Sequence, residues 1–173
     1  LISFVVVASV FAYSVLSAGI FSSQKGQEAI FAGLTEARAT MEIKGSMFAY
    51  GNTTTGNVTA VTVTLTNTMN GLPTDLTPNI GGNSTHATII SYIDRDQQVS
   101  DMPWSVSWIG RNNGDFSLDQ DEQAVITVDL ANRLTQSPGT YDKFTIEIKP
   151  RVGAPLVLSR TLPGKIDSVM DLH

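Results

Sequence analysis

The sequence predicts an α+β fold, in which a long N-terminal hydrophobic α-helix precedes an antiparallel immunoglobulin-like β-sandwich. Residues 1–24 contain no charged side chain, and Lys25 is the first. About 20 apolar residues are enough for a helix to span a bilayer core. From residue 61 onward, short runs alternate polar and apolar residues, which is the period-two pattern of a strand. We therefore divide the chain into a helix at residues 1–45 and a β-sandwich at residues 46–173.

The helical pattern continues beyond the uncharged segment. An apolar stripe recurs at spacings of four, three and four residues, which is helical, and consists of Ile30, Leu34, Ala37 and Met41. Arg38 and Glu42 are four residues apart and can pair weakly on a helix surface. No proline interrupts the first 44 residues. We expect one helix of roughly 44 residues, about 65 Å long at 1.5 Å per residue.

About seven short strands are expected in the remainder of the chain. The runs with strand character are residues 46–50, 61–66, 87–93, 104–109, 124–130, 143–149 and 155–162. Segments rich in Gly, Asn and Pro separate them, as turns do. Trp104 and Trp108 alternate with Val106 in one run, so we expect both indoles in the sandwich core, with a ligand platform as the alternative.

Composition excludes several classes of protein. The 173 residues carry a net charge of −5 and no basic block, so no nucleic-acid partner is expected. The absence of cysteine excludes a disulfide framework, a zinc–thiolate site and thiol catalysis. His86 and His173 have no partner at a recognisable motif spacing, and no nucleophile, phosphate or zinc motif is present. We expect no catalytic residues and no enzyme activity.

A charge-free helix before a soluble sandwich has three common explanations. It is a membrane anchor, an uncleaved signal sequence, or a filament-forming helix that is buried among copies of itself after assembly. Small residues four apart, Ala8 with Ala12 and Ser14 with Ala18, permit close helix approach, and the amphipathic extension exceeds what an anchor needs. We therefore predict polymerisation. The residues expected to form the helix contacts are Phe4, Val7, Ala8, Phe11, Ala12, Val15, Ala18, Gly19, Phe21, Ile30, Leu34 and Met41.

An acidic loop spans residues 112–122 and is centred on Gly114. Its oxygen-bearing residues are Asn113, Asp115, Asp119, Asp121 and Glu122. Hard cations such as Ca²⁺ bind loops of this chemistry. We interpret the loop as a structural turn and keep a calcium or other divalent-cation site as the alternative.

Three Asn-x-Ser/Thr sequons lie in turn-like segments rich in threonine and glycine. Their acceptor residues are Asn52, Asn57 and Asn83. A sequon in a surface turn can accept an N-linked glycan. We predict that at least one of the three is glycosylated.

The first 40 residues resemble the N-terminal region of the archaellin (archaeal flagellin) family, which is similar to type IV pilins. The shared elements follow a valine-rich helix and are Gly19-Ile20-Phe21, Ser23-Gln24-Lys25 and Gln27-Glu28. The later part of the chain is similar to the family's outer domain in class and length, with a looser sequence match. Archaellins often carry an acidic loop like residues 112–122, and some bind a cation in the outer domain.

The resemblance implies the structural subunit of an archaellum, a self-assembling filament that rotates to drive swimming. The helices would form the filament core and the sandwiches its outer shell. The implied partners are copies of the same chain, other archaellins, and a membrane motor and assembly machinery. The implied location is the cell surface of an archaeon, with the helix in the membrane before assembly. A pilin of an adhesion filament is the nearest alternative, and a membrane-anchored binding module is a third.

Overall fold

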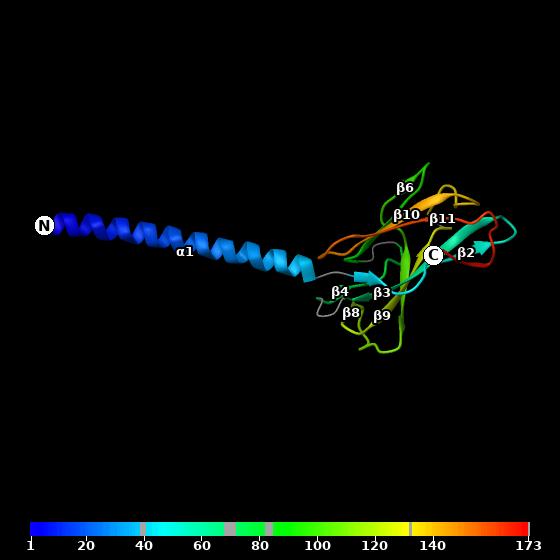
Figure 1. Ribbon diagram of the computed structural model, residues 1–173, viewed down its shortest axis with the longest axis horizontal. Helices are drawn as coiled ribbons and strands as arrows, with labels where there is room; N and C mark the ends of the chain where they lie inside the picture. The colour runs from blue at the N-terminus through cyan, green and yellow to red at the C-terminus, as the bar shows by residue number, and fades with distance from the viewer. Residues whose placement is uncertain (39–40, 68–71, 82–84, 132, 173) are drawn as a thin grey trace. The chain divides into compact units, whose positions relative to one another are not determined.

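The computed structural model describes residues 1–38, 41–67, 72–81, 85–131 and 133–172. The chain divides into two compact units, Leu1–Thr35 and Glu36–His173, and each is described here by itself. The first unit is helical, and the second contains strands throughout (Figure 1). This confirms the predicted α+β class. The second unit begins before residue 46, where the sandwich was expected to start.

Helix α1 spans Ile2–Arg38, so the prediction that it continues to residue 44 is wrong. Met41–Ile43 instead forms strand β1, in which Met41 pairs with Asn67 and is 4% exposed. Burial in the sandwich outweighs helical periodicity here, because the free energy of burying a methionine exceeds the small differences in helix propensity. Met41 therefore does not belong to the helical stripe, and Glu42 lies in a strand rather than on a helix surface.

A six-stranded antiparallel sheet forms one layer of the sandwich. Its order is β12-β2-β3-β9-β7, and β1 also pairs with β3. The strands are β2 (Phe48–Asn52), β3 (Asn57–Asn67), β7 (Trp104–Ile109), β9 (Gln123–Asp129) and β12 (Val169–Asp171). Several neighbouring strands of this sheet are far apart in sequence, such as β12 beside β2 and β3 beside β9. Tertiary packing as well as hairpins therefore sets the order of the strands.

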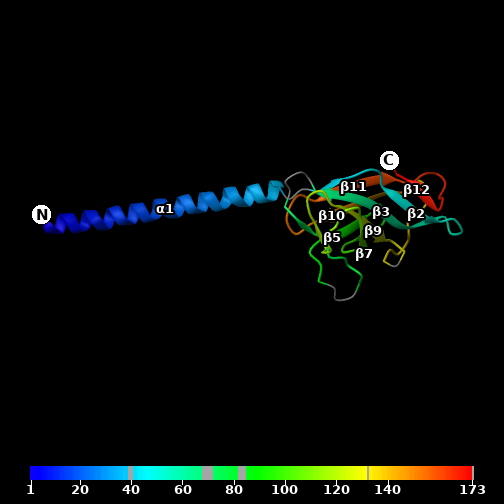
Figure 2. The same cartoon turned by 90° about the horizontal axis from the view of Figure 1, so that it is seen from below.

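A four-stranded sheet forms the second layer, in the order β11-β10-β5-β6. Its strands are β5 (Ile89–Ile93), β6 (Gln98–Val99), β10 (Lys143–Lys149) and β11 (Leu156–Thr161). A separate two-stranded sheet joins β4 (Thr74–Asp75) to β8 (Ser117–Leu118). The two large sheets lie face to face (Figure 2), as in a β-sandwich.

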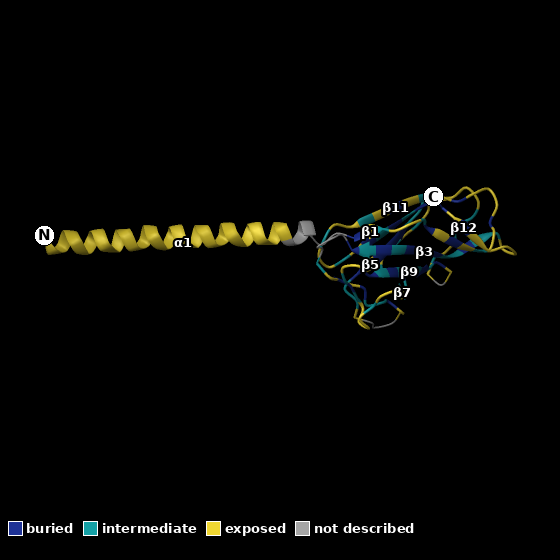
Figure 3. Cartoon of the chain, turned by 60° about the horizontal axis from the view of Figure 1, so that its bottom comes forward, coloured by how far each residue is buried: buried dark blue, intermediate teal, exposed yellow. Residues whose placement is uncertain are grey.

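The core lies between the inward faces of the two sheets (Figure 3). Strand β9 alternates half-buried and buried residues along its length, as a strand with one face on the core does. Tyr92 from β5 and Phe144 from β10 stack with ring centroids 5.9 Å apart. Trp104 is 2% exposed, and Trp108 packs against the same core. This confirms that both tryptophans belong to the core.

Candidate polymerisation surface

Helix α1 is apolar on all sides from its start to about residue 21. Its side chains are exposed (Figure 3), including Phe4 at 76%, Phe11 at 72% and Val15 at 64%. The segment Ile2–Leu34 is long and apolar enough to cross a membrane, and none of its most apolar window is buried. A helix that is hydrophobic on every side is stable only when its whole circumference is covered by lipid or by protein.

A shallow apolar groove on this helix is built from two alanines between larger side chains. Ala8 and Ala12 form its floor, and Phe11, Val15 and Leu16 form its walls. Residues four apart lie above one another on one helix face. The groove therefore offers a hole into which a side chain of a neighbouring helix can pack.

Two serines of the helix donate hydrogen bonds from their hydroxyls to the helix backbone. Ser9 Oγ donates to Val6 O at 2.8 Å, and Ser14 Oγ donates to Val10 O at 3.0 Å. These bonds stay within the helix, so they persist in an environment without water. The two serines therefore add small size to the surface with little desolvation cost.

The C-terminal part of the helix carries its first charges as a pair. Lys25 Nζ lies 2.6 Å from Glu28 Oε2, and both side chains are exposed. Ile30 is 70% exposed and Leu34 is 49% exposed, so both are available to a neighbour. The charged pair marks where the uniformly apolar surface gives way to a surface of mixed character.

The acidic loop is held by hydrogen bonds to its own backbone. Glu122 is 4% exposed, and its carboxylate accepts from Asn113 N at 3.0 Å and from Asp119 N at 3.2 Å. Asn113 Nδ2 donates to Asp119 Oδ2 at 2.8 Å. Asp115 and Asp121 are exposed. Within the described ranges, no three His, Cys, Asp or Glu residues are arranged to hold a metal ion, and Glu122 and Asn113 bond within the loop itself.

The sequons occupy different positions on the sandwich. Asn52 is exposed at the end of β2, where its Oδ1 accepts from the backbone of Thr54 and Thr55. Asn57 is half-buried at the start of β3. The predicted site at Asn83 lies outside the described residues. Asn52 is the more exposed of the two described acceptor residues.

One pair of side chains in the sandwich resembles a catalytic dyad but joins segments of the chain. His86 Nε2 lies 2.7 Å from Asp101 Oδ1, a pairing that the sequence alone did not indicate. Asn79 Nδ2 donates to the same carboxylate oxygen at 2.9 Å. These bonds join three segments of the chain around Asp101. His173 lies outside the described residues.

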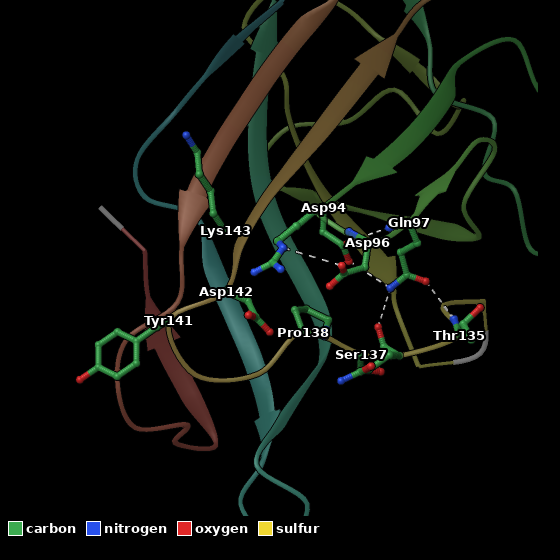
Figure 4. Close-up of a pocket in the computed structure, with 11 residues that line it drawn as sticks. Asp94, Asp96, Gln97, Thr135, Ser137, Pro138, Tyr141, Asp142 and Lys143 are labelled. Carbon is green, nitrogen blue, oxygen red and sulfur yellow. Dashed lines mark hydrogen bonds and ion pairs between the residues drawn. The ribbon is translucent and has the colours of Figure 1, made fainter.

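A polar cleft of about 470 Å³ lies between the β5–β6 turn and the loop before β10 (Figure 4). Gln97 joins the two sides, because its Nε2 donates to Gln136 O at 2.6 Å and its Oε1 accepts from Thr135 N at 3.0 Å. Burial raises the pKa of Asp94, but bonds from the Gln97 amide and from the Asp96 and Gln97 backbone outweigh it and lower the pKa overall. Asp94 is thus held ionised as the acceptor of a turn, not as a proton donor.

These observations define a class of protein: a structural subunit with a helix that requires burial and a sandwich that folds around its own core. The model of the archaeal-type flagellin family matches residues 1–160. The chain belongs to the archaeal-type flagellin family, and it is a structural filament subunit rather than an enzyme.

Individual relatives and solved structures agree with this membership. "Probable flagellin 1" of Archaeoglobus fulgidus is 36% identical over 191 residues, covering 99% of this chain and 89% of that protein. "Probable flagellin 2" of the same organism is 31% identical, with coverages of 94% and 84%. The archaeal flagellum of Methanospirillum hungatei strain JF1 superposes with a TM-score of 0.76 at 21% identity, covering 99% of this chain and 94% of that chain. An archaeal flagellin of Methanocaldococcus jannaschii gives 0.63 at 15% identity, with coverages of 76% and 95%.

Proposed function

We propose that this chain polymerises through α1 into an archaellum, a cell-surface filament that rotates to drive swimming. The single observation that carries the proposal is the exposure of α1, whose stretch at residues 2–21 is charge-free and mostly apolar and whose large apolar side chains are exposed. Burying one Val, Leu, Ile or Phe side chain contributes about 1.5–3 kcal/mol. A helix with many such side chains strongly favours a state in which neighbours cover it.

Lipid and a bundle of identical helices both provide that cover, so α1 is suited to two successive environments. In the membrane the apolar surface contacts acyl chains. In the filament the groove at Ala8 and Ala12 receives side chains of neighbouring helices, and close packing, rather than hydrophobicity alone, favours association. The proposal therefore includes residence in the membrane before assembly and in the filament core afterwards.

The contact residues we propose lie on the uniformly apolar stretch and its extension. They are Phe4, Val7, Ala8, Phe11, Ala12, Val15, Ala18, Gly19, Phe21, Ile30 and Leu34. A Cβ added at Gly19 would meet no heavy atom within 4 Å, so the glycine leaves room on the helix surface for a neighbour. The proposed partners are copies of this chain, other archaellins, and the membrane machinery that assembles and turns the filament.

We further propose N-glycosylation of the sandwich, at Asn52 in preference to Asn57. Asn52 is exposed, and its amide nitrogen is free of the bonds that its Oδ1 makes to the turn. One tryptic peptide, residues 45–95, carries all three acceptors. Fragmentation of this peptide from purified filaments should localise a mass increment to Asn52, and this increment should be absent in Asn52→Gln. An unmodified polypeptide mass for the intact subunit would contradict the proposal.

Deletion of residues 1–19 tests the main proposal. In cells whose only filament subunit is the deleted chain, we expect no filaments in electron micrographs and no swimming, whereas full-length chains restore both. Tethered cells separate an archaellum from an adhesion pilus, since only a rotating filament turns the cell body. Filaments of normal length from the deleted chain would contradict polymerisation through α1.

A further inference from the structure

The outer face of the six-stranded sheet is nearly free of charge. Strands β2, β3 and β7 contain no charged residue, and β9 contains one, Asp129, at its end. In contrast, β10 places Lys143, Glu147 and Lys149 on the outer face of the other sheet, where their neighbours along the strand are buried. The two faces of the sandwich therefore differ in charge although the chain as a whole carries −5.

Strand register gathers the uncharged side chains into one continuous surface. Phe48 lies beside Thr62, Thr62 beside Thr127, and Thr127 beside Ser105. The next row along the strands joins Thr64, Val125 and Ser107. We call this surface the neutral face and define it by Phe48, Thr62, Thr64, Val125, Thr127 and Ser107.

The side chains of the neutral face point away from the core. Val61, Val63 and Ile126, which alternate with them, are fully or almost fully buried between the sheets, and successive side chains of a strand point to opposite faces. Phe48 remains 39% exposed, and Ser107 is exposed. Thr62 is only 9% exposed, and Thr64, Val125 and Thr127 are half-buried. The surface is therefore open to a partner chiefly at Phe48 and Ser107.

The chemistry of the neutral face fits a protein partner that is itself uncharged at the contact. Thr62 Oγ1 and Thr127 Oγ1 lie 3.3 Å apart, and either can donate. Hydroxyls both donate and accept, so they can bond to another uncharged polar surface. Charges stand at the margins, in Glu42, Asp129 and Asp171. Protein interfaces likewise have few charged residues at their centre and a polar margin.

Electrostatics selects a second copy of this chain as the occupant. Copies that each carry −5 repel one another, and two like charges 4 Å apart cost about 1 kcal/mol even in water. Contact through a charge-free surface avoids most of this cost. A nucleic acid, an anionic lipid or a strongly charged protein would instead need the complementary charges that this surface lacks.

We propose that the neutral face is where the sandwich of one copy contacts the sandwich of the next copy in the filament. The proposal rests on polymerisation through α1, which brings the copies together. The contact is heterologous in a helical polymer, so the neutral face meets a different surface of the neighbouring sandwich.

Single cysteines test this contact cleanly, because the chain contains none. Ser107→Cys places a thiol on the neutral face, in β7. The matched control Ser159→Cys places one on the outer face of the other sheet, in β11. Both serines are exposed, and both strands lie at the edge of their sheets. Each variant is labelled with a maleimide in intact filaments and in subunits dispersed by detergent.

The expected result is that Ser107→Cys labels at least tenfold more slowly in filaments than in dispersed subunits, while Ser159→Cys labels at similar rates in both. Equal labelling of Ser107→Cys in the two states would overturn the inference. So would protection of both cysteines to the same degree. Electron micrographs of the same samples separate the two proposals. If filaments form and their Ser107→Cys thiol still reacts, only this inference is contradicted. If unsubstituted chains form no filaments, polymerisation through α1 is contradicted.

A charge placed on the same surface gives an independent measurement. Ser107→Lys should reduce filament yield severalfold, because a buried unpaired ammonium is costly, whereas Ser159→Lys should leave the yield unchanged. Tryptophan emission of the dispersed subunits checks that both variants fold, since Trp104 and Trp108 report on the core. Normal filament yield from a folded Ser107→Lys chain would contradict the proposed contact.

Discussion

At the scale of single residues, the sandwich depends on close backbone approaches that only certain side chains permit. Gly51 stands where the register of β2 against β3 shifts. A Cβ at this position would lie 2.6 Å from Asp167 O and would also collide with the Ile166 side chain. Backbone cannot move aside as easily as the end of a flexible side chain, so the strand and the segment before β12 must separate.

We predict that Gly51→Ala lowers the free energy of unfolding by about 1–3 kcal/mol, as overpacking does. Denaturant titration of detergent-dispersed subunits, followed by tryptophan emission, measures the change. Gly139→Ala is the control, because a Cβ there meets only atoms at 3.6 Å or more. A Gly51→Ala chain as stable as the unsubstituted chain would show that the segment before β12 moves freely.

Asp94 gives a pH-dependent contribution to stability. Its Oδ1 accepts from the backbone of Asp96 and of Gln97, each at 2.7 Å, and its Oδ2 accepts from Gln97 Nε2 at 3.0 Å. Although burial raises its pKa, these bonds lower the pKa in the folded state below the ordinary value. A lowered folded pKa adds stability at pH values above the unfolded pKa of about 3.9, and this stability is lost as pH falls through the folded pKa.

We predict that Asp94→Ala lowers the free energy of unfolding by about 1 kcal/mol at pH 7. The difference from the unsubstituted chain should shrink at pH 3, because that pH lies below the unfolded pKa of about 3.9 and the stabilisation from the lowered folded pKa is being lost. Tryptophan-monitored unfolding at the two pH values measures both. Asp96→Ala should have little effect, since the Asp96 side chain is 87% exposed. A difference that grows on acidification would refute the role assigned to the Asp94 carboxylate.

At the scale of elements, the hydrophobicity of α1 and the shape of its surface can be tested separately. Ala12→Leu keeps the helix apolar but fills the groove that Ala8 and Ala12 form between larger side chains. Lipid adapts to the added bulk, whereas a packed helix neighbour does not. The groove is therefore expected to matter for assembly and not for insertion into the membrane.

We predict that Ala12→Leu leaves the chain in the membrane fraction but shortens filaments or abolishes them. Val10→Leu is the matched control, because residue 10 lies on the opposite side of the helix from residue 12 at 100° per residue. Immunoblots of membrane fractions and lengths measured in electron micrographs give the two readouts. Full-length filaments from Ala12→Leu would exclude the groove from the helix contacts.

At the scale of the whole molecule, the two units obtain their stability from different sources. Every buried hydrophobic residue in the described part of the chain lies between Met41 and Leu172. The sandwich therefore contains a complete core without α1. No described side chain of the helix is buried in that core, and the large apolar side chains described on the helix are exposed.

We predict that a chain of residues 36–173 folds as a soluble monomer. Its tryptophan emission and thermal unfolding midpoint should match those of the sandwich in the full-length, detergent-dispersed chain, within a few degrees. Gel filtration and fluorescence-detected melting measure these properties. Aggregated or unfolded material from this shorter chain would show that α1 contributes to the stability of the sandwich.

Much of this architecture follows from local sequence patterns. The apolar opening specified a helix, and the long alternating runs specified β3, β5, β7, β9, β10 and β11 at nearly their observed positions. The strands that the sequence patterns did not predict have only two or three residues, as in β4, β6, β8 and β12. Segments so short carry too little periodicity to be recognised, and pairing with a neighbouring strand alone defines them.

The sequence by itself determined that one end of this protein must be buried by something other than water and that the rest forms a sandwich. Only the tertiary structure decided where the helix gives way to β1, that Met41 joins the core, that His86 meets Asp101 and that the uncharged side chains form one face. The physical reason is the separation along the chain over which each interaction acts. Hydrophobic periodicity acts between residues a few positions apart, whereas strand register and core burial depend on segments that meet only after the chain has folded.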